Sequence, residues 1–260
     1  MEEDLVERQS RHFDGIAAHY ANSRRHPNHL LLKDLIWSSF FAGKDFIPRE
    51  CERVLEPMCG LGEGHDILRR HLYRRDFAYQ GFDYSLPMVE AARACRPELD
   101  FEHQDVSTFA AEGDPWDLVV LIGGLHHVYA RCEAVIEGLS AALRPGGYFL
   151  NFEPTHACWL TRSVRERIYA RNALFDPATE QGFELDDLDG LFRRQGYRKV
   201  DQVYAGLAAY VLYYNPDAFP GLNLGGERAV RTAFWFDRLL WRRALGRKLA
   251  FATITLWQKT

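Results

Sequence analysis

A glycine-rich stretch, Val54–Gly64 (VLEPMCGLGEG), follows a short apolar run and could hold a ligand. Glycines adopt positive φ angles and let the backbone approach a bound molecule closely. In an open α/β sheet, the ligand crevice lies where a strand passes into a helix. A dinucleotide fingerprint is excluded because His65 stands where its third glycine is needed, and the G-x-x-x-x-G-K-[ST] phosphate loop is absent. Taken alone, the stretch could still be a structural strand–helix turn.

Two carboxylates end the strand candidates that come next along the chain. Asp83 closes residues 78–83, and Asp105 follows residues 100–104. A carboxylate at the end of a parallel strand can accept hydrogen bonds from both hydroxyls of a ribose. Each aspartate could instead be a helix N-cap, a position at which Asp is favoured.

Taken together, these pieces resemble the class I S-adenosylmethionine (SAM) methyltransferases. The matching segments stand in the family's order: LEPMCGLG at 55–62, GFDYS at 81–85, HQDV at 103–106, WDLVVLI at 116–122 and LRPGG at 143–147. The resemblance covers roughly residues 10–155 well and the C-terminal third in outline. It implies S-adenosyl-L-methionine as the cofactor and an enzyme that transfers its methyl group.

The resemblance also implies which core residues contact SAM. In the family, the acid that corresponds to Asp83 binds the ribose and a methionine like Met88 packs on the adenine. Asp105 and the backbone N–H of Val106 match the segment that reads the adenine edge. The full expected set in the core is Glu56, Gly60, Gly62, Asp83, Tyr84, Met88, Asp105, Val106 and Ile122.

One part of the glycine loop departs from the family pattern. Pro57 and Met58 replace smaller residues, and proline removes a backbone donor. We expect altered packing under the loop and retained SAM binding.

The N-terminal segment His12–Tyr20 resembles a helix that many small-molecule members lay over the SAM pocket. By this resemblance, Tyr20 lines the donor site. Arg24 or Arg25 could pair with the methionine carboxylate, since a guanidinium binds a carboxylate through two hydrogen bonds. Both arginines could instead be solvated.

Two adjacent histidines, His126 and His127, follow the fourth strand candidate, where the family has its acceptor pocket. A hydroxyl or ammonium acceptor must lose a proton on methylation, so a general base is useful there. Histidine suits this role at neutral pH. One of the two could merely cap the next helix, and Glu153 and His156 are rival bases. His26 and His29 have no nearby carboxylate cluster, so no metal is expected.

Strand and helix candidates alternate from residue 52 onwards, which predicts a mostly parallel sheet with helices on both faces. The expected strands are 52–57, 78–83, 100–104, 117–122, 147–153, 197–205 and 249–258. The expected helices are 4–20, 28–42, 63–74, 86–94, 131–143, 159–174, 185–194 and 227–245. The last strand resembles the antiparallel seventh strand of the family, so a Rossmann-like seven-stranded α/β fold is expected.

We expect a single domain with a cap. Residues 1–45 form helices over the cofactor pocket, residues 46–154 form the SAM-binding core, and residues 155–260 cap the acceptor and complete the sheet. Residues 155–260 carry 17 of the 35 aromatic side chains, so we expect this part to select the acceptor. The helix over 227–245 is expected to show an arginine-rich face, solvated or turned toward an anionic substrate, a carrier protein or a membrane.

The composition excludes several classes of protein. With 47% hydrophobic residues and a net charge of −4, the chain resembles an ordinary globular protein and not a nucleic-acid binder. Five cysteines without a CxxC pair suggest neither disulfides nor zinc. No signal peptide and no membrane span are recognisable, so a cytoplasmic location without stable membrane insertion is expected. The sequence is compatible with a homodimer.

The sequence thus predicts SAM-dependent methylation of a small, partly apolar or aromatic acceptor, with oxygen favoured over nitrogen or carbon. One alternative is a SAM-binding catalyst that transfers no methyl group. A second alternative is a nucleotide-dependent oxidoreductase.

Overall fold

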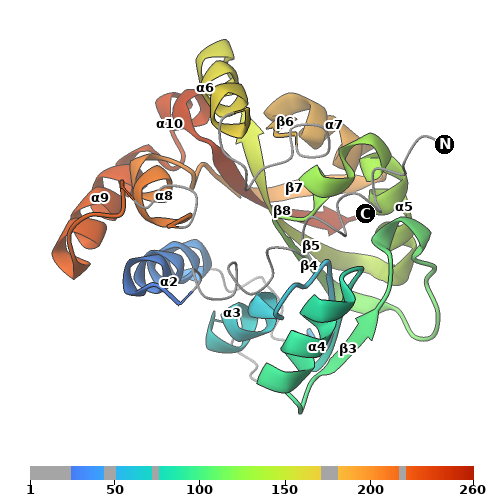
Figure 1. Cartoon of the computed structure of the whole chain (residues 1–260). Helices are drawn as coiled ribbons and strands as arrows, with labels where there is room; N and C mark the ends of the chain where they lie inside the picture. The colour runs from blue at the N-terminus through green and yellow to red at the C-terminus, as the bar shows by residue number, and fades with distance from the viewer. Residues whose placement is uncertain (1–24, 44–50, 72–75, 171–180, 217–220) are drawn as a thin grey trace.

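The computed structural model describes residues 25–43, 51–71, 76–170, 181–216 and 221–260. Within these residues, one twisted sheet runs through the molecule with helices on both faces (Figure 1). The expected helix over 4–20 lies outside the described residues.

The sheet has the strand order β3-β2-β1-β4-β5-β8-β7. The strands are β1 Arg53–Pro57, β2 Ala78–Asp83, β3 Asp100–His103, β4 Trp116–Ile122, β5 Leu143–His156, β7 Tyr197–Val203 and β8 Ala252–Lys259. A two-residue strand, β6 (Phe183–Glu184), pairs with the end of β5. The strands from β3 to β5 pair in parallel, whereas β8 is antiparallel to both β5 and β7. The expected seven-stranded Rossmann-like sheet with an antiparallel last strand is therefore confirmed.

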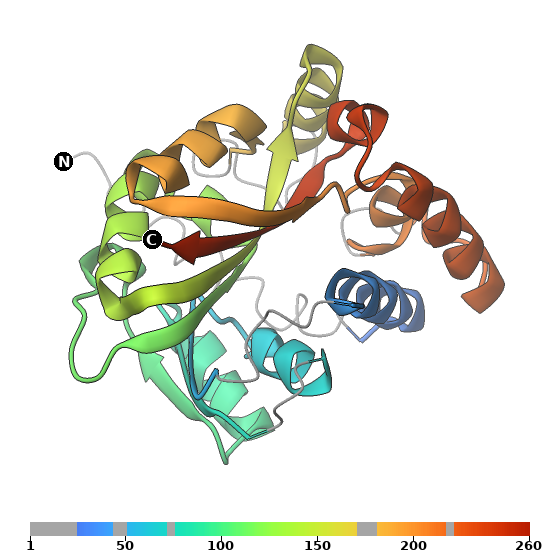
Figure 2. The same ribbon diagram turned by 180° about the vertical axis from the view of Figure 1, so that it is seen from behind.

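The helices are α2 Pro27–Phe41, α3 Glu63–His71, α4 Leu86–Cys95, α5 Cys132–Ala142, α6 Trp159–Tyr169, α7 Leu185–Arg194, α8 Ala208–Tyr213, α9 Glu227–Leu240 and α10 Ala244–Leu249. Two short 3₁₀ segments, η1 (Val106–Thr108) and η2 (Leu125–Arg131), follow β3 and β4. Helices α2, α3, α4, α8 and α9 contribute to one hydrophobic cluster, while α5 and α7 contribute to the other. Figure 2 shows the same two layers from behind.

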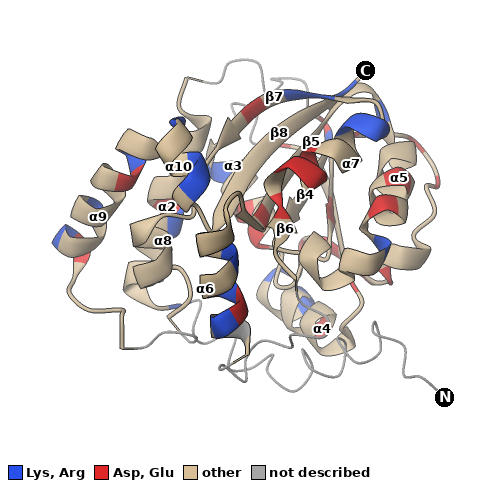
Figure 3. Cartoon of the chain, turned by 90° about the horizontal axis from the view of Figure 1, so that it is seen from above, with Lys and Arg blue, Asp and Glu red and all other residues tan. Residues whose placement is uncertain are grey.

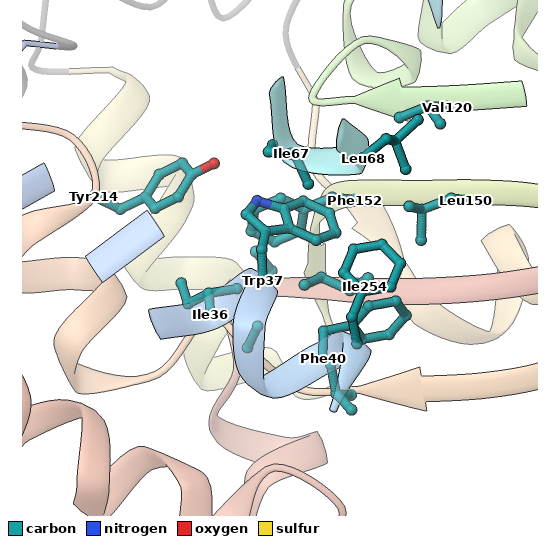
Figure 4. Packing of buried hydrophobic residues seen from close by; sticks show 14 of the residues in the cluster. Ile36, Trp37, Phe40, Ile67, Leu68, Val120, Leu150, Phe152, Tyr214 and Ile254 are labelled. Carbon is teal, nitrogen blue, oxygen red and sulfur yellow. The ribbon is translucent and has the colours of Figure 1, made fainter. Parts of the chain in front are cut away.

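Helix α2 packs its apolar side against one face of the sheet. The side chain of His26 caps its first turn by accepting from Asn28 N–H at 3.2 Å, and Pro27 fits the first helical position. Ile36 and Phe40, four residues apart, point to the same side and are fully buried. Between them, the Trp37 ring stands edge-on to Phe152 of β5 with 5.8 Å between centroids (Figure 4). The helix is thus fixed beside the end of β5.

The prediction of one helix over 227–245 is wrong at its C-terminal end. Helix α9 ends at Leu240, and α10 begins at Ala244. The turn between them closes when Arg243 N–H donates to the Leu240 carbonyl at 2.9 Å, and the Trp241 carbonyl accepts from Tyr204 N–H at 2.9 Å. Neither carbonyl accepts the helical hydrogen bond that would continue α9, so the helix ends here. Helix α8 and strand β6 were not predicted.

Candidate active site

The glycine loop lies at the carboxyl end of β1, against the end of β2. Gly60 and Gly62 have φ angles of +52° and +76°, the left-handed conformation that glycine adopts without strain. Cys59 N–H donates to the Phe82 carbonyl at 3.0 Å, and Gly60 N–H donates to Asp83 Oδ2 at 2.9 Å. The loop is therefore fastened to the strand end that carries Asp83.

Asp83 has the geometry expected of a ribose-binding carboxylate. Its second oxygen, Oδ1, accepts from Ser85 N–H at 2.9 Å, and the residue is only 6% exposed. Burial raises the pKa of Asp83, while the N–H donors of Ser85 and Gly60 oppose that rise. A carboxylate offers about four lone-pair sites, so each oxygen can accept one further hydroxyl. Together with the backbone conformation of the glycine loop, Asp83 fits the ribose end of SAM.

Glu56, the other acid of the loop, turns inward. Its carboxylate accepts from Gly64 N–H at 2.9 Å, from His65 N–H at 3.1 Å and from the Tyr79 hydroxyl at 2.6 Å. A Cβ on Gly64 would lie 2.6 Å from the Glu56 carboxyl carbon, so glycine is required at this close approach. Burial raises the pKa of Glu56 to about 7. Glu56 therefore fixes the start of α3, and its direct contact with SAM stays a prediction.

Of the residues expected around the adenine, Asp105 and Val106 follow β3 and Met88 lies in the first turn of α4. Asp105 caps η1, with Oδ1 accepting from Ser107 N–H at 2.8 Å and Oδ2 from the Ser107 hydroxyl at 2.7 Å. Val106 and Met88 are 4% and 3% exposed. The N-cap alternative is thus correct for Asp105, whose carboxylate orders the turn that would present the Val106 backbone.

Three further residues of the expected donor set can be placed, and one cannot. Tyr84 and Ile122 are half-buried, and the Tyr84 carbonyl lies 2.9 Å from His103 Nε2. Arg25 is exposed in the turn before α2. Tyr20, like Arg24, lies outside the described residues, so its place over the donor site stays a prediction.

Met58 has a φ angle of +53°, the left-handed conformation that is rare for a residue with a side chain. The Met58 side chain packs against the residues that follow β4. A Cβ on Gly124 would lie 3.0 Å from Met58 Sδ. The altered packing expected under the glycine loop thus involves Met58, which has a strained backbone and lies between the ends of β1 and β4.

Replacing Met58 with glycine and with alanine separates strain from packing. Both substitutions remove the side chain, but only glycine relieves the left-handed backbone. We expect Met58→Gly to be more stable to urea than Met58→Ala by about 1 kcal/mol, the reverse of the usual order. Equal midpoints, or a more stable alanine variant, would show that the backbone here is unstrained.

The two histidines follow β4, and His126 is held by Glu153 of β5. The register Ile122↔Phe152 sets the end of β4 beside Phe152 of β5, the residue before Glu153. Glu153 Oε1 accepts from Gly124 N–H and from Leu125 N–H, each at 2.9 Å. Glu153 Oε2 lies 2.9 Å from His126 Nδ1 and accepts from His126 N–H at 3.4 Å. The carboxylate therefore caps η2 and orients the imidazole at the same time.

Burial shifts the pKa values of both members of this pair. Burial lowers the pKa of His126 to about 3, with Arg165 acting in the same direction, so the imidazole is neutral at physiological pH. Burial raises the pKa of Glu153 to about 8, against the three backbone donors that favour its ionised form. When Glu153 is ionised, Nδ1 of His126 carries the proton and Nε2 is left as an acceptor.

The structure brings His126 and Glu153 together and places His127 beside His126. His127 is half-buried, with its ring centroid 3.9 Å from that of His126. His156, at the end of β5, is 8% exposed, and burial lowers its pKa to about 4. Glu153, the expected rival base, is a hydrogen-bond partner of His126, and which of the two acts as the base stays a prediction. The signal in the sequence was a carboxylate directly after Phe152, near the end of the strand.

The described residues contain neither a cluster of metal ligands nor a membrane-spanning helix. No group of three or more His, Cys, Asp or Glu side chains among them could hold a metal ion. None of the described helices is long and apolar enough to cross a membrane.

Comparison with known proteins points to one family. A methyltransferase domain family matches residues 54–147, which run from β1 to the start of β5. A probable S-adenosylmethionine-dependent methyltransferase of Mycolicibacterium smegmatis is 28% identical over 194 residues, which are 72% of this chain and 68% of that protein.

Solved structures agree in fold. Magnesium protoporphyrin IX methyltransferase from Synechocystis, with S-adenosylhomocysteine (SAH) bound, superposes with a TM-score of 0.60 at 12% identity, over 99% of this chain and 100% of that one. The [4+2]-cyclase SpnF superposes with a TM-score of 0.56 at 17% identity, over 86% of this chain and 80% of that one. At these identities the likeness concerns the fold alone.

The family match, the similar relative and the sheet topology agree. The family match covers the glycine loop and Asp83, the curated relative extends over most of the chain, and the antiparallel β8 completes the sheet expected of the family. These findings argue against the oxidoreductase alternative, which the missing third glycine had already weakened. Residues 54–147 form a methyltransferase domain, and together these findings support a class I, Rossmann-like SAM-dependent methyltransferase.

Proposed function

We propose that this methyltransferase methylates a hydroxyl oxygen of a small, partly apolar or aromatic molecule. One observation carries the preference for oxygen: a buried, neutral histidine is oriented by a carboxylate beside the donor loop. Methylation of a neutral hydroxyl releases a proton, and Nε2 of His126 is an acceptor for that proton when Glu153 is ionised.

Within the proposal, each group has a defined task. Bound SAM supplies an electrophilic methyl group on a sulfonium. The Asp83 carboxylate and the glycine loop hold the donor. His126 Nε2 accepts the hydrogen bond of the acceptor O–H and takes its proton as the oxygen–carbon bond forms and the carbon–sulfur bond breaks. Glu153 stabilises the imidazolium, and the proton then leaves to solvent.

The aromatic side chains around Phe152 support the apolar character of the acceptor. Phe152 directly precedes Glu153 in β5, and Tyr214 stands edge-on to it with 5.6 Å between centroids. Tyr210 and Tyr214 stack at 4.6 Å. Apolar and aromatic walls with a few polar groups are typical of small-molecule sites. The C-terminal part of the chain, which supplies both tyrosines, would then select the acceptor.

The test is product analysis with the purified chain. The protein is incubated with SAM and a panel of phenols, aliphatic alcohols, amines and carbon nucleophiles, and SAH and methylated products are measured by mass spectrometry. The proposal expects SAH and an O-methylated product in equal amounts for at least one hydroxyl compound. Methylation confined to amines or carbon acids would overturn the preference for oxygen.

A second candidate function is a SAM-binding catalyst that transfers no methyl group. The likeness in fold to SpnF, a [4+2]-cyclase, is the observation that favours this alternative. The same experiment separates the two, since such a catalyst would convert its substrate without accumulating SAH.

The reaction should speed up with rising pH. Below the pKa of about 8, protonated Glu153 donates to Nδ1 and leaves Nε2 as a donor, so His126 cannot accept a proton. Above it, Glu153 is ionised and Nε2 is an acceptor. We expect kcat/KM for a hydroxyl acceptor of high pKa to rise up to about tenfold per pH unit below pH 8, with a plateau above pH 9.

The buried imidazole leads to a second feature of the same profile. Because the pKa of His126 is lowered to about 3, we expect no separate change in kcat/KM with a midpoint near pH 6.5. A profile governed by a single group near pH 6.5 would indicate a solvent-exposed histidine as the base and contradict the assignment to His126.

A further inference from the structure

The surface of the protein carries an unusual concentration of exposed apolar side chains on α6, α9 and α10. Among the described residues, eleven large apolar side chains are exposed, and more than half of them lie on these three helices. Trp159 is 77% exposed, Trp235 58% and Phe236 57%. Leu239 of α9 and Leu245 of α10 are also exposed.

These helices form one continuous part of the molecule. Helix α10 follows α9 after a short turn, and Cys158 Sγ, just before α6, donates to the Lys248 carbonyl of α10 at 3.1 Å. Figures 1 and 2 both show α6 beside α10 and α9 running on from it at the edge of the molecule. We call the surface of these three helices the aromatic–basic surface.

Helix α9 has an inner and an outer face. Val230 and Phe234 are buried against the core, as is Trp241 just after the helix. Trp235 and Phe236 point outward and touch each other at 4.8 Å between ring centroids. Since the inner face already buries the residues that fix the helix, the outer aromatics are not needed to hold it in place.

Uncompensated positive charge surrounds these apolar side chains. Arg228, Arg238, Arg243 and Lys248 are exposed, and none forms an ion pair with a residue that the structure describes. The one exposed acid of α9, Glu227, is paired with Arg231. The other acid, Asp237, is buried and accepts from the N–H groups of Ala208 and Ala209. Figure 3 shows basic residues on all three helices.

We propose that the aromatic–basic surface docks the protein on an anionic lipid bilayer. Tryptophan and other large apolar side chains enter the interface between headgroups and acyl chains, and arginines and lysines pair with anionic headgroups. Helix α9 has 14 residues and cannot span a bilayer, so it lies along the interface. The proposal does not depend on the nature of the methyl acceptor.

Two other occupants fit the surface less well. A second copy of the chain related by a two-fold axis would bring the unpaired arginines against an identical set. A nucleic acid would satisfy the arginines but would leave Trp159, Trp235 and Phe236 opposite a phosphate backbone. An anionic bilayer satisfies both the charge and the apolar side chains.

Vesicle sedimentation with the full chain tests the proposal. Vesicles of phosphatidylcholine mixed with phosphatidylglycerol are compared with vesicles of phosphatidylcholine alone. We expect binding to the mixed vesicles that the double variants Trp235→Ser/Phe236→Ser and Arg238→Glu/Arg243→Glu each weaken by about tenfold or more. The matched control Leu86→Ser, which removes an exposed leucine from α4, should bind like the wild type.

Calorimetric SAM binding shows whether each variant is folded and keeps the result separate from the proposed function. Absence of wild-type binding to the mixed vesicles would overturn the proposal, as would an equal loss in Leu86→Ser. So would light scattering that shows a dimer which Trp235→Ser/Phe236→Ser converts to a monomer. Tighter binding to duplex DNA than to mixed vesicles would also contradict it.

Discussion

Replacing His126 with asparagine is expected to lower kcat for a neutral hydroxyl acceptor by about 10²- to 10⁴-fold, the usual contribution of a general base. Asparagine can still donate its amide hydrogen to Glu153, so the turn after β4 keeps its anchor. It has no nitrogen that can take a proton. Initial rates measured by SAH release, with SAM affinity measured by calorimetry, check the prediction.

The acceptor itself provides the control. A phenol that is already ionised at the assay pH needs no base, so the loss caused by His126→Asn should largely disappear with it. Glu153→Gln should show the same pattern, because its amide donates to Nδ1 and leaves Nε2 carrying a proton. If both variants lose the same activity toward neutral and ionised acceptors, the pair positions the acceptor and does not take its proton.

Replacing Asp83 with alanine is expected to weaken SAM binding by about 1–3 kcal/mol, roughly 5- to 150-fold in Kd, the scale of lost hydrogen bonds to a charged group. The substitution removes the ribose acceptor and also frees the N–H groups of Gly60 and Ser85. The glycine loop then loses its anchor on the end of β2. Calorimetric titration with SAM and SAH measures both affinities.

A neighbouring acid serves as the matched control for Asp83. Glu102 lies on the adjacent strand β3 and is exposed, so Glu102→Ala removes the same charge from the same edge without touching the loop. Its SAM affinity should stay within about twofold of the wild type. An unchanged affinity in Asp83→Ala, or an equal loss in Glu102→Ala, would remove Asp83 from the ribose site.

The central strands and the donor loop could be predicted from the sequence because their signals are local. Residues 118–122 are all apolar and include three β-branched side chains, and the strand expected over 117–122 forms β4 with one residue more. The glycines after β1 and the acid that ends β2 are likewise indicated by their neighbours along the chain. In a parallel sheet these strand ends meet at one edge, so the sequence order was enough to bring them together.

The rest depended on contacts between distant segments. Asp237 accepts hydrogen bonds from the first turn of α8, 28 and 29 residues away along the chain. The sequence of 208–213 has no pattern of its own that predicts this helix. The pairing of Glu153 with His126 spans 27 residues and depends on the register of β4 against β5. Registers of buried strands are set by packing. The sequence could therefore name both residues but could not pair them.

A crystal structure with SAH bound is the most direct test of the claim that His126 serves the methyl acceptor. We predict that the ribose hydroxyls contact Asp83 and that the SAH sulfur faces the end of β4. The gap between this sulfur and His126 Nε2 should have room for one methyl group and one acceptor oxygen, about 5–7 Å in all. A sulfur that faces away from His126, or protein atoms that fill the gap, would contradict the assignment.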